Sequence, residues 1–143
     1  MKKREPISHI MTKSVHTLNL KNSLEDAEKA FKKYHVRHLP VIAGKELIGM
    51  LSLTDLARIS FVDSFGDYND HEAEVDTSVY SMLTIEQVMA RKIETVDVGT
   101  SIREVAETLS QREFHALPVL ENGSLVGIVT TTDLIKYLLA QYN

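Results

Sequence analysis

The feature that most constrains this chain is an internal repeat with a spacing of 78 residues. Under that single shift, 12 of the 53 positions from Ile7 to Ile59 are identical, and no gap is needed. Most other positions keep their apolar character, as in the pair Leu24 and Ile102. One ungapped register over a whole unit indicates a duplication. At roughly 55 residues, neither copy buries enough surface to be comfortably stable alone, so we expect the two copies to pack together.

Each copy of the repeat is expected to form a helical turn followed by β, α, β, β and α. In the first copy, strands are predicted at 15–18, 39–42 and 47–51, and helices at 24–34 and 54–60. The fold class is therefore α+β, with two pseudo-symmetric repeats packed face to face through their sheets. We predict domains at residues 1–60 and 84–143, joined by a connector at 61–83.

The connector at 61–83 carries most of the charge imbalance of the chain. It holds six acidic residues and no Lys or Arg, whereas the formal net charge of the whole chain is −4. The rest of the chain is nearly neutral and has no basic stripe, so a nucleic-acid partner is not expected. A solvated acidic linker is the simpler interpretation. The aromatic residues Phe61, Phe65, Tyr68 and Tyr80 favour the alternative of a lid over a ligand site.

The composition limits the compartment and the chemistry. The chain has no cysteine, which excludes disulfides, thiolate metal sites and cysteine nucleophiles. No apolar run approaches the ~18 residues of a membrane span, and no apolar segment follows the basic start as in a signal peptide. We expect a cytoplasmic protein with no membrane partner.

A hydroxyl and a carboxylate stand three residues apart at the last strand–helix junction of each copy. Thr130 and Asp133 form this pair in the second copy, and Ser52 and Asp55 form it in the first. The carboxylate can accept two hydrogen bonds from a vicinal diol such as a ribose, and the helix N-terminus favours an anion. The alternative is that both pairs only cap their helices.

Three motifs occur in the same order in both copies: Ile-x-x-x-Met, Leu-Pro-Val, and Gly-hydrophobic-hydrophobic-Ser/Thr-x-Thr-Asp. This arrangement resembles a tandem pair of cystathionine-β-synthase (CBS) domains, the Bateman module. The resemblance implies a regulatory module that binds AMP, ADP, ATP or sometimes S-adenosylmethionine in clefts between the two domains, with no other cofactor. It also implies a homodimer, and for a stand-alone module an effector protein in trans.

The resemblance implies two composite sites, because the Ser/Thr-x-x-Asp of one domain faces the first strand and the residues before Leu-Pro of the other domain. The first site would comprise His16, Thr17, Arg37, His38, Ile128, Thr130 and Asp133. The second would comprise Met50, Ser52, Asp55, Thr95, His115 and Ala116.

The two expected sites differ in charge. Arg37 and His38 occupy the positions where related subunits place a basic pair against phosphates, and Arg is the best planar phosphate donor. The second site keeps only His115, and acidic Glu94 replaces His16. Repulsion between a carboxylate and a phosphate makes the second site poorer for polyphosphates.

The leading functional hypothesis is a non-catalytic adenine-nucleotide sensor, and two rivals remain. An enzyme acting on nucleotides would need a nucleophile or an acid–base pair, and the duplicated carboxylates Asp55 and Asp133 would lie in separate clefts. We therefore assign no catalytic residue. A structural dimerisation module with degenerate clefts is the other rival.

Two further expectations concern metal and dimer contacts. The histidines His16, His35 and His38 have no carboxylate at a convincing spacing, so no metal site is expected. Dimer contacts are expected on the outer helices, which carry Phe31 in one copy and Leu134, Leu138 and Leu139 in the other.

Overall fold

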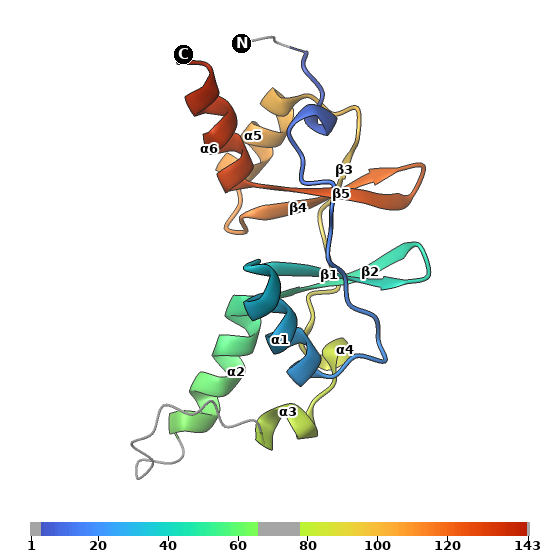
Figure 1. Cartoon of the computed structure of the whole chain (residues 1–143), viewed down its shortest axis with the longest axis vertical. Coiled ribbons are helices and arrows are strands. Elements are labelled where there is room, and N and C mark those ends of the chain that lie inside the picture. Colours follow the sequence, from blue (N-terminus) through green and yellow to red (C-terminus); the bar gives the residue numbers. More distant parts are fainter. Residues whose placement is uncertain (1–3, 66–77, 143) are drawn as a thin grey trace. The chain divides into compact units, whose positions relative to one another are not determined.

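The computed structural model describes residues 4–65 and 78–142. The chain divides into two compact units, which we name by their residues: the 16–92 unit, and the 93–143 unit, which also contains residues 1–15. Figure 1 shows the helices and strands of both units, coloured along the sequence. Each unit combines a small sheet with helices. The α+β fold class expected from the sequence is confirmed.

The 16–92 unit is built on a two-stranded antiparallel sheet. Its elements are α1 (Leu24–Tyr34), β1 (His38–Ala43), β2 (Glu46–Ser52), α2 (Leu53–Phe65), α3 (Ser78–Met82) and α4 (Ile85–Val88). The strand expected at 15–18 is reduced to a single parallel bridge between Leu18 and Val41. Leu18 donates to the carbonyl of Pro40 and accepts from the N–H of Ile42, and the next donor toward the start of β1 would be Pro40, which has no N–H.

The 93–143 unit is built on a three-stranded sheet in the order β3-β4-β5. Its elements are the 3-10 turn η1 (Ile7–His9), β3 (Val96–Asp97), α5 (Ile102–Ser110), β4 (Ala116–Glu121), β5 (Ser124–Thr130) and α6 (Thr131–Ala140). β3 runs parallel to β4, and β4 and β5 are antiparallel. Asn122 and Gly123 turn the β4–β5 hairpin with φ of 51° and 81°, the left-handed conformation that matches strand twist.

Hydroxyl side chains set where the helices begin. At α1, the Ser23 hydroxyl accepts a hydrogen bond from the N–H of Asp26, and the Asp26 carboxylate accepts one from the N–H of Ser23. The backbone hydrogen bond from Ser23 lowers the pKa of Asp26. Thr84 and Gln87 make the same reciprocal pair at α4, and Ser101 caps α5. These side chains satisfy backbone N–H groups that have no acceptor within the first turn of each helix.

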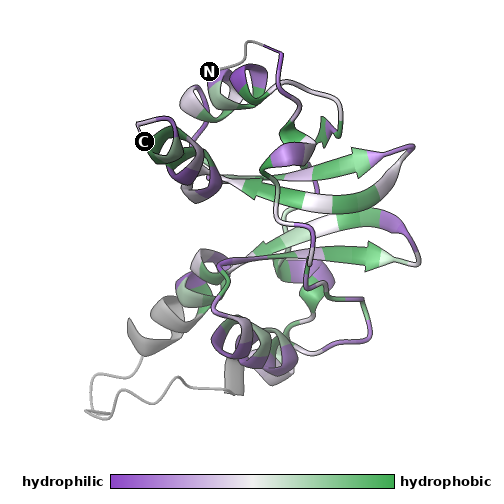
Figure 2. Ribbon diagram, turned by 45° about the horizontal axis from the view of Figure 1, so that its top comes forward, coloured by the Kyte–Doolittle hydropathy of each residue, from purple (hydrophilic) through white to green (hydrophobic). Residues whose placement is uncertain are grey.

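Each unit has its own apolar core. Figure 2 shows predominantly hydrophobic strands, while α1 and α5 each carry a hydrophilic side. The core of the 93–143 unit comprises Ile7, Ile102, Val105, Leu109, Leu117, Val119 and Val129. The core of the 16–92 unit comprises Leu18, Leu24, Ala27, Phe31, Leu39, Val41, Leu51, Leu56, Tyr80, Ile85 and Met89.

The leading turn of each repeat packs into the compact unit that contains most of the other repeat. Ile7, from the start of the first repeat, is fully buried among residues of the second repeat. Its N–H bonds to the carbonyl of Thr100 at 2.7 Å, and the N–H of Ile102 bonds to the carbonyl of Glu5 at 2.8 Å. Ile85, at the equivalent place in the second repeat, is fully buried in the core of the 16–92 unit. The compact units therefore do not coincide with the two sequence repeats.

A methionine contacts a glycine in each unit and fixes this exchange. A β-carbon added to Gly127 would overlap the sulfur of Met11, and one added to Gly49 would overlap the sulfur of Met89. A side chain at either glycine would displace the methionine. This contact explains why the repeat keeps both residue types at these positions.

The structure corrects one expectation about the outer helices and qualifies others. Phe31 is only 3% exposed and belongs to the core of the 16–92 unit, so its assignment to a dimer surface is wrong. It lies on the face of α1 that carries the buried Leu24 and Ala27. Leu134 is half-buried against the other core. Leu138, which is 44% exposed, and its neighbour Leu139 remain on the surface as expected.

The connector at 61–83 is described only in part, because residues 66–77 lie outside the described residues. Its first residues belong to α2, which extends to Phe65, and α3 lies near its end. Tyr80 is 4% exposed within the core of the 16–92 unit, which removes it from a lid. Tyr68 and the side chains of Phe61 and Phe65 lie outside the described part, and the lid hypothesis stays a prediction for them.

Replacing Ile7 by alanine should destabilise the 93–143 unit by about 2–5 kcal/mol, the usual cost of truncating a fully buried aliphatic side chain. We expect faster amide hydrogen exchange in α5 and β4, because these elements line the core that Ile7 fills. Leu20→Ala is the control: Leu20 is 45% exposed and belongs to neither core cluster, so the change should stay within about 0.5 kcal/mol. Loss of protection in α1 and β1 instead would contradict the exchanged packing.

Candidate functional site

The Thr130–Asp133 pair forms a reciprocal cap at the start of α6. The Asp133 oxygen Oδ2 accepts hydrogen bonds from the Thr130 N–H at 2.9 Å and from the Thr130 hydroxyl at 3.2 Å. The hydroxyl in turn accepts from the Asp133 N–H at 3.2 Å. Both residues are half-buried. The capping interpretation of this pair is therefore correct, and any ligand role comes in addition to it.

Ser52 and Asp55 repeat this geometry at the start of α2. The N–H of Ser52 donates to Asp55 Oδ2 at 3.1 Å, and the N–H of Asp55 donates to the Ser52 hydroxyl at 3.1 Å. The two hydroxyl–carboxylate pairs identified in the sequence therefore have one local structure, in which the cap engages mainly one carboxylate oxygen.

The second oxygen of Asp133 retains capacity for a ligand. Within the described residues, this oxygen accepts a hydrogen bond from the Thr12 hydroxyl at 3.5 Å, the limit of a useful bond. A carboxylate offers about four acceptor positions, of which these contacts use three. One ribose hydroxyl can therefore bind directly, and the second can bind by replacing the weak Thr12 contact. Thr12 was not identified from the sequence. The 78-residue register offered a signal, because the equivalent residue is Ala90, which has no hydroxyl.

Thr12 reaches Asp133 through the exchanged N-terminal segment. The N–H of Thr12 donates to the carbonyl of Ile128 at 2.8 Å, and the N–H of Ile128 donates back at 3.0 Å. The equivalent bonds between Met50 and Ala90 are 3.0 and 2.8 Å. Met50 and Ile128, both expected to line the sites, are each 8% exposed and belong to neither core cluster.

Four of the residues expected in the first site gather within the 16–92 unit. Leu18 bridges β1 beside Pro40, which brings the preceding His16 and Thr17 next to the start of β1, where Arg37 and His38 lie. The His16 ring stacks on Tyr34, with 3.5 Å between centroids and 9° between planes. Arg37 has an exposed side chain. We call His16, Thr17, Arg37 and His38 the basic half-set.

Three of the residues expected in the second site gather in the same way within the 93–143 unit. The parallel pairing of Val96 with Val119 places Thr95 near the start of β4, where His115 and Ala116 lie. We call Thr95, His115 and Ala116 the His115 half-set.

In each unit, these half-sets adjoin the hydroxyl–carboxylate pair of that same unit. His38 pairs with Ser52 across the β1–β2 hairpin, and Ala116 pairs with Thr130 across the β4–β5 hairpin. The Leu53 N–H also bonds to the carbonyl of Arg37 at 2.9 Å. Directly opposed residues of antiparallel strands project to the same side. One hairpin end per unit therefore carries the candidate ligand groups.

Glu94 is not the free negative charge that the sequence suggested. Its carboxylate accepts hydrogen bonds from Arg112 Nε at 2.8 Å and from Nη2 at 3.3 Å. These bonds, together with the charge of Glu94, raise the pKa of Arg112. The expected repulsion between Glu94 and a phosphate is therefore offset by a paired cation.

Neither a metal-ligand group nor a membrane-spanning helix is present in the described residues. In residues 4–65 and 78–142, no group of three His, Asp or Glu side chains is arranged to hold a metal ion. Within the same residues, no helix combines the length and hydropathy that crossing a bilayer requires.

The chain belongs to the CBS domain family, whose model matches residues 7–61 and 85–140. Protein MJ1225 of Methanocaldococcus jannaschii is 28% identical over 134 residues, which are 93% of this chain and 47% of MJ1225. Inosine-5'-monophosphate dehydrogenase of Staphylococcus haemolyticus is 29% identical over 120 residues, which are 81% of this chain and 21% of the enzyme. The chain thus spans from about a fifth to about a half of these relatives.

Solved structures of CBS domain pairs share the fold. CBSX2 in complex with AMP superposes with a TM-score of 0.77 at 22% identity, covering 97% of this chain and 99% of CBSX2. The CBS domain pair of protein MJ0100, in complex with 5'-methylthioadenosine and S-adenosyl-L-methionine, gives a TM-score of 0.76 at 22% identity, covering 95% and 97% of the two chains. The two CBS repeats expected from the sequence are confirmed.

Replacing Thr130 by alanine should lower the free energy of unfolding by about 1 kcal/mol, because the N–H of Asp133 then loses its acceptor. Thr130→Ser keeps the hydroxyl and should retain most of the stability. Ser23→Ala is the matched control at α1, and it should cost a similar amount. Urea denaturation measures all three variants, and an unchanged Thr130→Ala midpoint would show that this cap does not stabilise α6.

Proposed function

We propose that this chain is a non-catalytic sensor module that binds an adenine nucleotide and relays its presence to another protein. The observation that carries the proposal is the Asp133 carboxylate: its capping bonds leave one oxygen whose contact within the described part of the chain is the 3.5 Å bond from Thr12. A ribose can donate one hydroxyl to the remaining position on that oxygen and the other by replacing the weak Thr12 contact. Asp133 is half-buried, so a ligand hydrogen bond there is partly shielded from water.

The basic half-set supports a ligand with a phosphate tail. The guanidinium of Arg37 is permanently charged and exposed, while its backbone is fixed by the bond from Leu53. The stacking of His16 on Tyr34 orients the imidazole of His16 within this half-set. We propose that Arg37, His38 and His16 contact phosphates and that Asp133 and Thr130 contact a ribose.

Relatives narrow the ligand class. The CBSX2 structure contains AMP, and the MJ0100 structure contains 5'-methylthioadenosine and S-adenosyl-L-methionine. All three molecules carry an adenosine core, whereas their tails differ in charge. By analogy, we propose an adenosine-based ligand for this chain, with AMP, ADP and ATP as the first candidates and a cytoplasmic setting.

Calorimetric titration with ATP and with adenosine separates the proposed roles. Asp133→Ala should weaken both ligands, because both carry the ribose. Arg37→Ala should weaken ATP by about tenfold or more and leave adenosine little changed, since charge-assisted hydrogen bonds contribute about 1.5–3 kcal/mol each and about 1.4 kcal/mol is tenfold. A double-mutant cycle between Arg37 and Asp133 then tests whether one ligand touches both residues.

Asp26→Ala is the matched control for Asp133→Ala. It removes the same reciprocal cap at α1, where we propose no ligand, so stability should fall comparably while binding is retained. Equal weakening by both variants would show that Asp133 acts only as a cap. Equal affinity for GTP and ATP would contradict adenine recognition. No thermal shift with any adenine compound would favour the structural dimerisation module, and nucleotide hydrolysis would favour an enzyme.

We also propose that the chain forms a homodimer through α6. Ile135, Leu138, Leu139 and Tyr142 are all exposed, by 44% to 80%, at this end of the chain. Exposed apolar side chains gathered on one helix favour association. Sedimentation at tens of micromolar should give a species of about twice 16.1 kDa, and Leu139→Lys should shift it to the monomer. A monomeric wild type would contradict this assembly.

A further inference from the structure

The same two positions of the repeat touch in both units, but with different chemistry. Glu94 and Arg112 form the bidentate ion pair of the 93–143 unit. Their equivalents under the 78-residue shift are His16 and Tyr34, which stack in the 16–92 unit. The fold therefore brings this pair of positions together in both units. In one unit the pair is a carboxylate and a guanidinium, and in the other it is two rings.

The ion pair lies at the edge of the His115 half-set. Glu94 directly precedes Thr95, and Arg112 stands three residues before His115. Both segments end at neighbouring strands, because β3 and β4 run parallel. The Arg112 side chain is thus positioned beside the groups that we assign to ligand binding, although the sequence pattern alone did not identify it.

A guanidinium binds a carboxylate and a phosphate with the same two-pronged geometry. The Glu94 carboxylate therefore occupies the face of Arg112 that a phosphate would use. The pair is solvent-accessible, with side-chain exposures of 43% for Arg112 and 36% for Glu94. Exposed ion pairs contribute little to stability, so a phosphate group with more charge than a carboxylate can displace Glu94.

We propose that Arg112 is a phosphate-binding residue of the His115 half-set and that Glu94 competes with the ligand for it. Glu94 then sets how strongly this half-set takes ligands with a phosphate tail. The equivalent positions of the basic half-set contain no carboxylate, so its cations face no internal competitor there. This inference rests on the proposed function, and it replaces simple repulsion by Glu94 as the reason for unequal sites.

A double-mutant cycle tests the competition, with Glu94→Gln, Arg112→Gln and the double variant. Binding of ATP and of adenosine is followed by NMR at the backbone amide of His115, and also at the Arg112 Nε–H where that residue is present. Glu94→Gln should tighten ATP binding roughly three- to tenfold at these signals and leave adenosine unchanged. Arg112→Gln should weaken ATP, and the double variant should behave like Arg112→Gln because Glu94 acts through Arg112.

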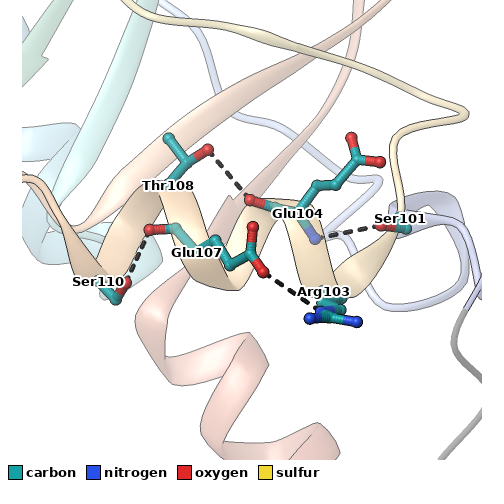
Figure 3. A network of polar contacts seen from close by, with 6 residues as sticks. All are labelled: Ser101, Arg103, Glu104, Glu107, Thr108 and Ser110. Carbon is teal, nitrogen blue, oxygen red and sulfur yellow. Dashed lines mark hydrogen bonds and ion pairs between the residues drawn. The ribbon is translucent and has the colours of Figure 1, made fainter.

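Glu107→Gln supplies a matched control on α5. Figure 3 shows the Glu107 carboxylate paired with Arg103 along this helix, near the Ser101 cap. The Nε–Oε1 distance is 3.2 Å and both side chains are more than half exposed. This variant removes an exposed ion pair of the same kind at a place where we propose no ligand, so ATP affinity at the His115 signal should not change.

Each other outcome overturns a stated claim. If Glu94→Gln tightens ATP equally with and without Arg112, direct repulsion operates and the competition is refuted. If ATP binds through Arg37 while the His115 and Arg112 signals stay unchanged in every variant, Arg112 binds no phosphate and the proposed function stands. If wild type binds neither ATP nor adenosine, the proposed function itself is wrong, and this inference falls with it.

Discussion

The structure depends on one interaction, which occurs twice. An isoleucine from each repeat is buried in the core that contains most of the other repeat. Ile7 and Ile85 are both fully buried, and each joins a core whose other members come mainly from the opposite repeat. A fully buried isoleucine contributes about 1.5–3 kcal/mol by leaving water, which is a large share of the stability of a small unit. The methionine–glycine contacts one turn further along hold the exchanged segments against the sheets.

Much of the fold could be predicted from the sequence, because its signals are local. The helix expected at 24–34 is α1 (Leu24–Tyr34), and the strand expected at 47–51 lies within β2 (Glu46–Ser52). The Ser23 cap and the turn at Gly44 act within a few residues of these elements. The exchange of leading segments could not be predicted in this way. Periodicity shows that Ile7 is buried, but it does not show which of two similar cores receives it.

The same limit applies to the candidate site. The residue types at Thr130 and Asp133 predict both a cap and a ligand group, and the structure shows the cap while leaving an acceptor oxygen. Charge counting along the sequence treated Glu94 as an isolated anion because its partner Arg112 is 18 residues away. Thr12 could not be predicted as a site residue for a similar reason, since it is 121 residues away in the sequence from its partner Asp133. Contacts across such separations need the fold before they can be recognised.

The exchanged packing also orders events during synthesis. Ile7 precedes the 16–92 unit in the chain, whereas its partners Ile102 to Val129 follow that unit and are synthesised after it. The 16–92 unit can close its core once Ile85 has emerged. The N-terminal segment can pack only after the second repeat has been synthesised. Contacts of such long sequence separation slow folding and leave apolar surface open meanwhile. The 16–92 unit can therefore complete its core first, and Ile7 is buried only after the residues that follow that unit have been synthesised.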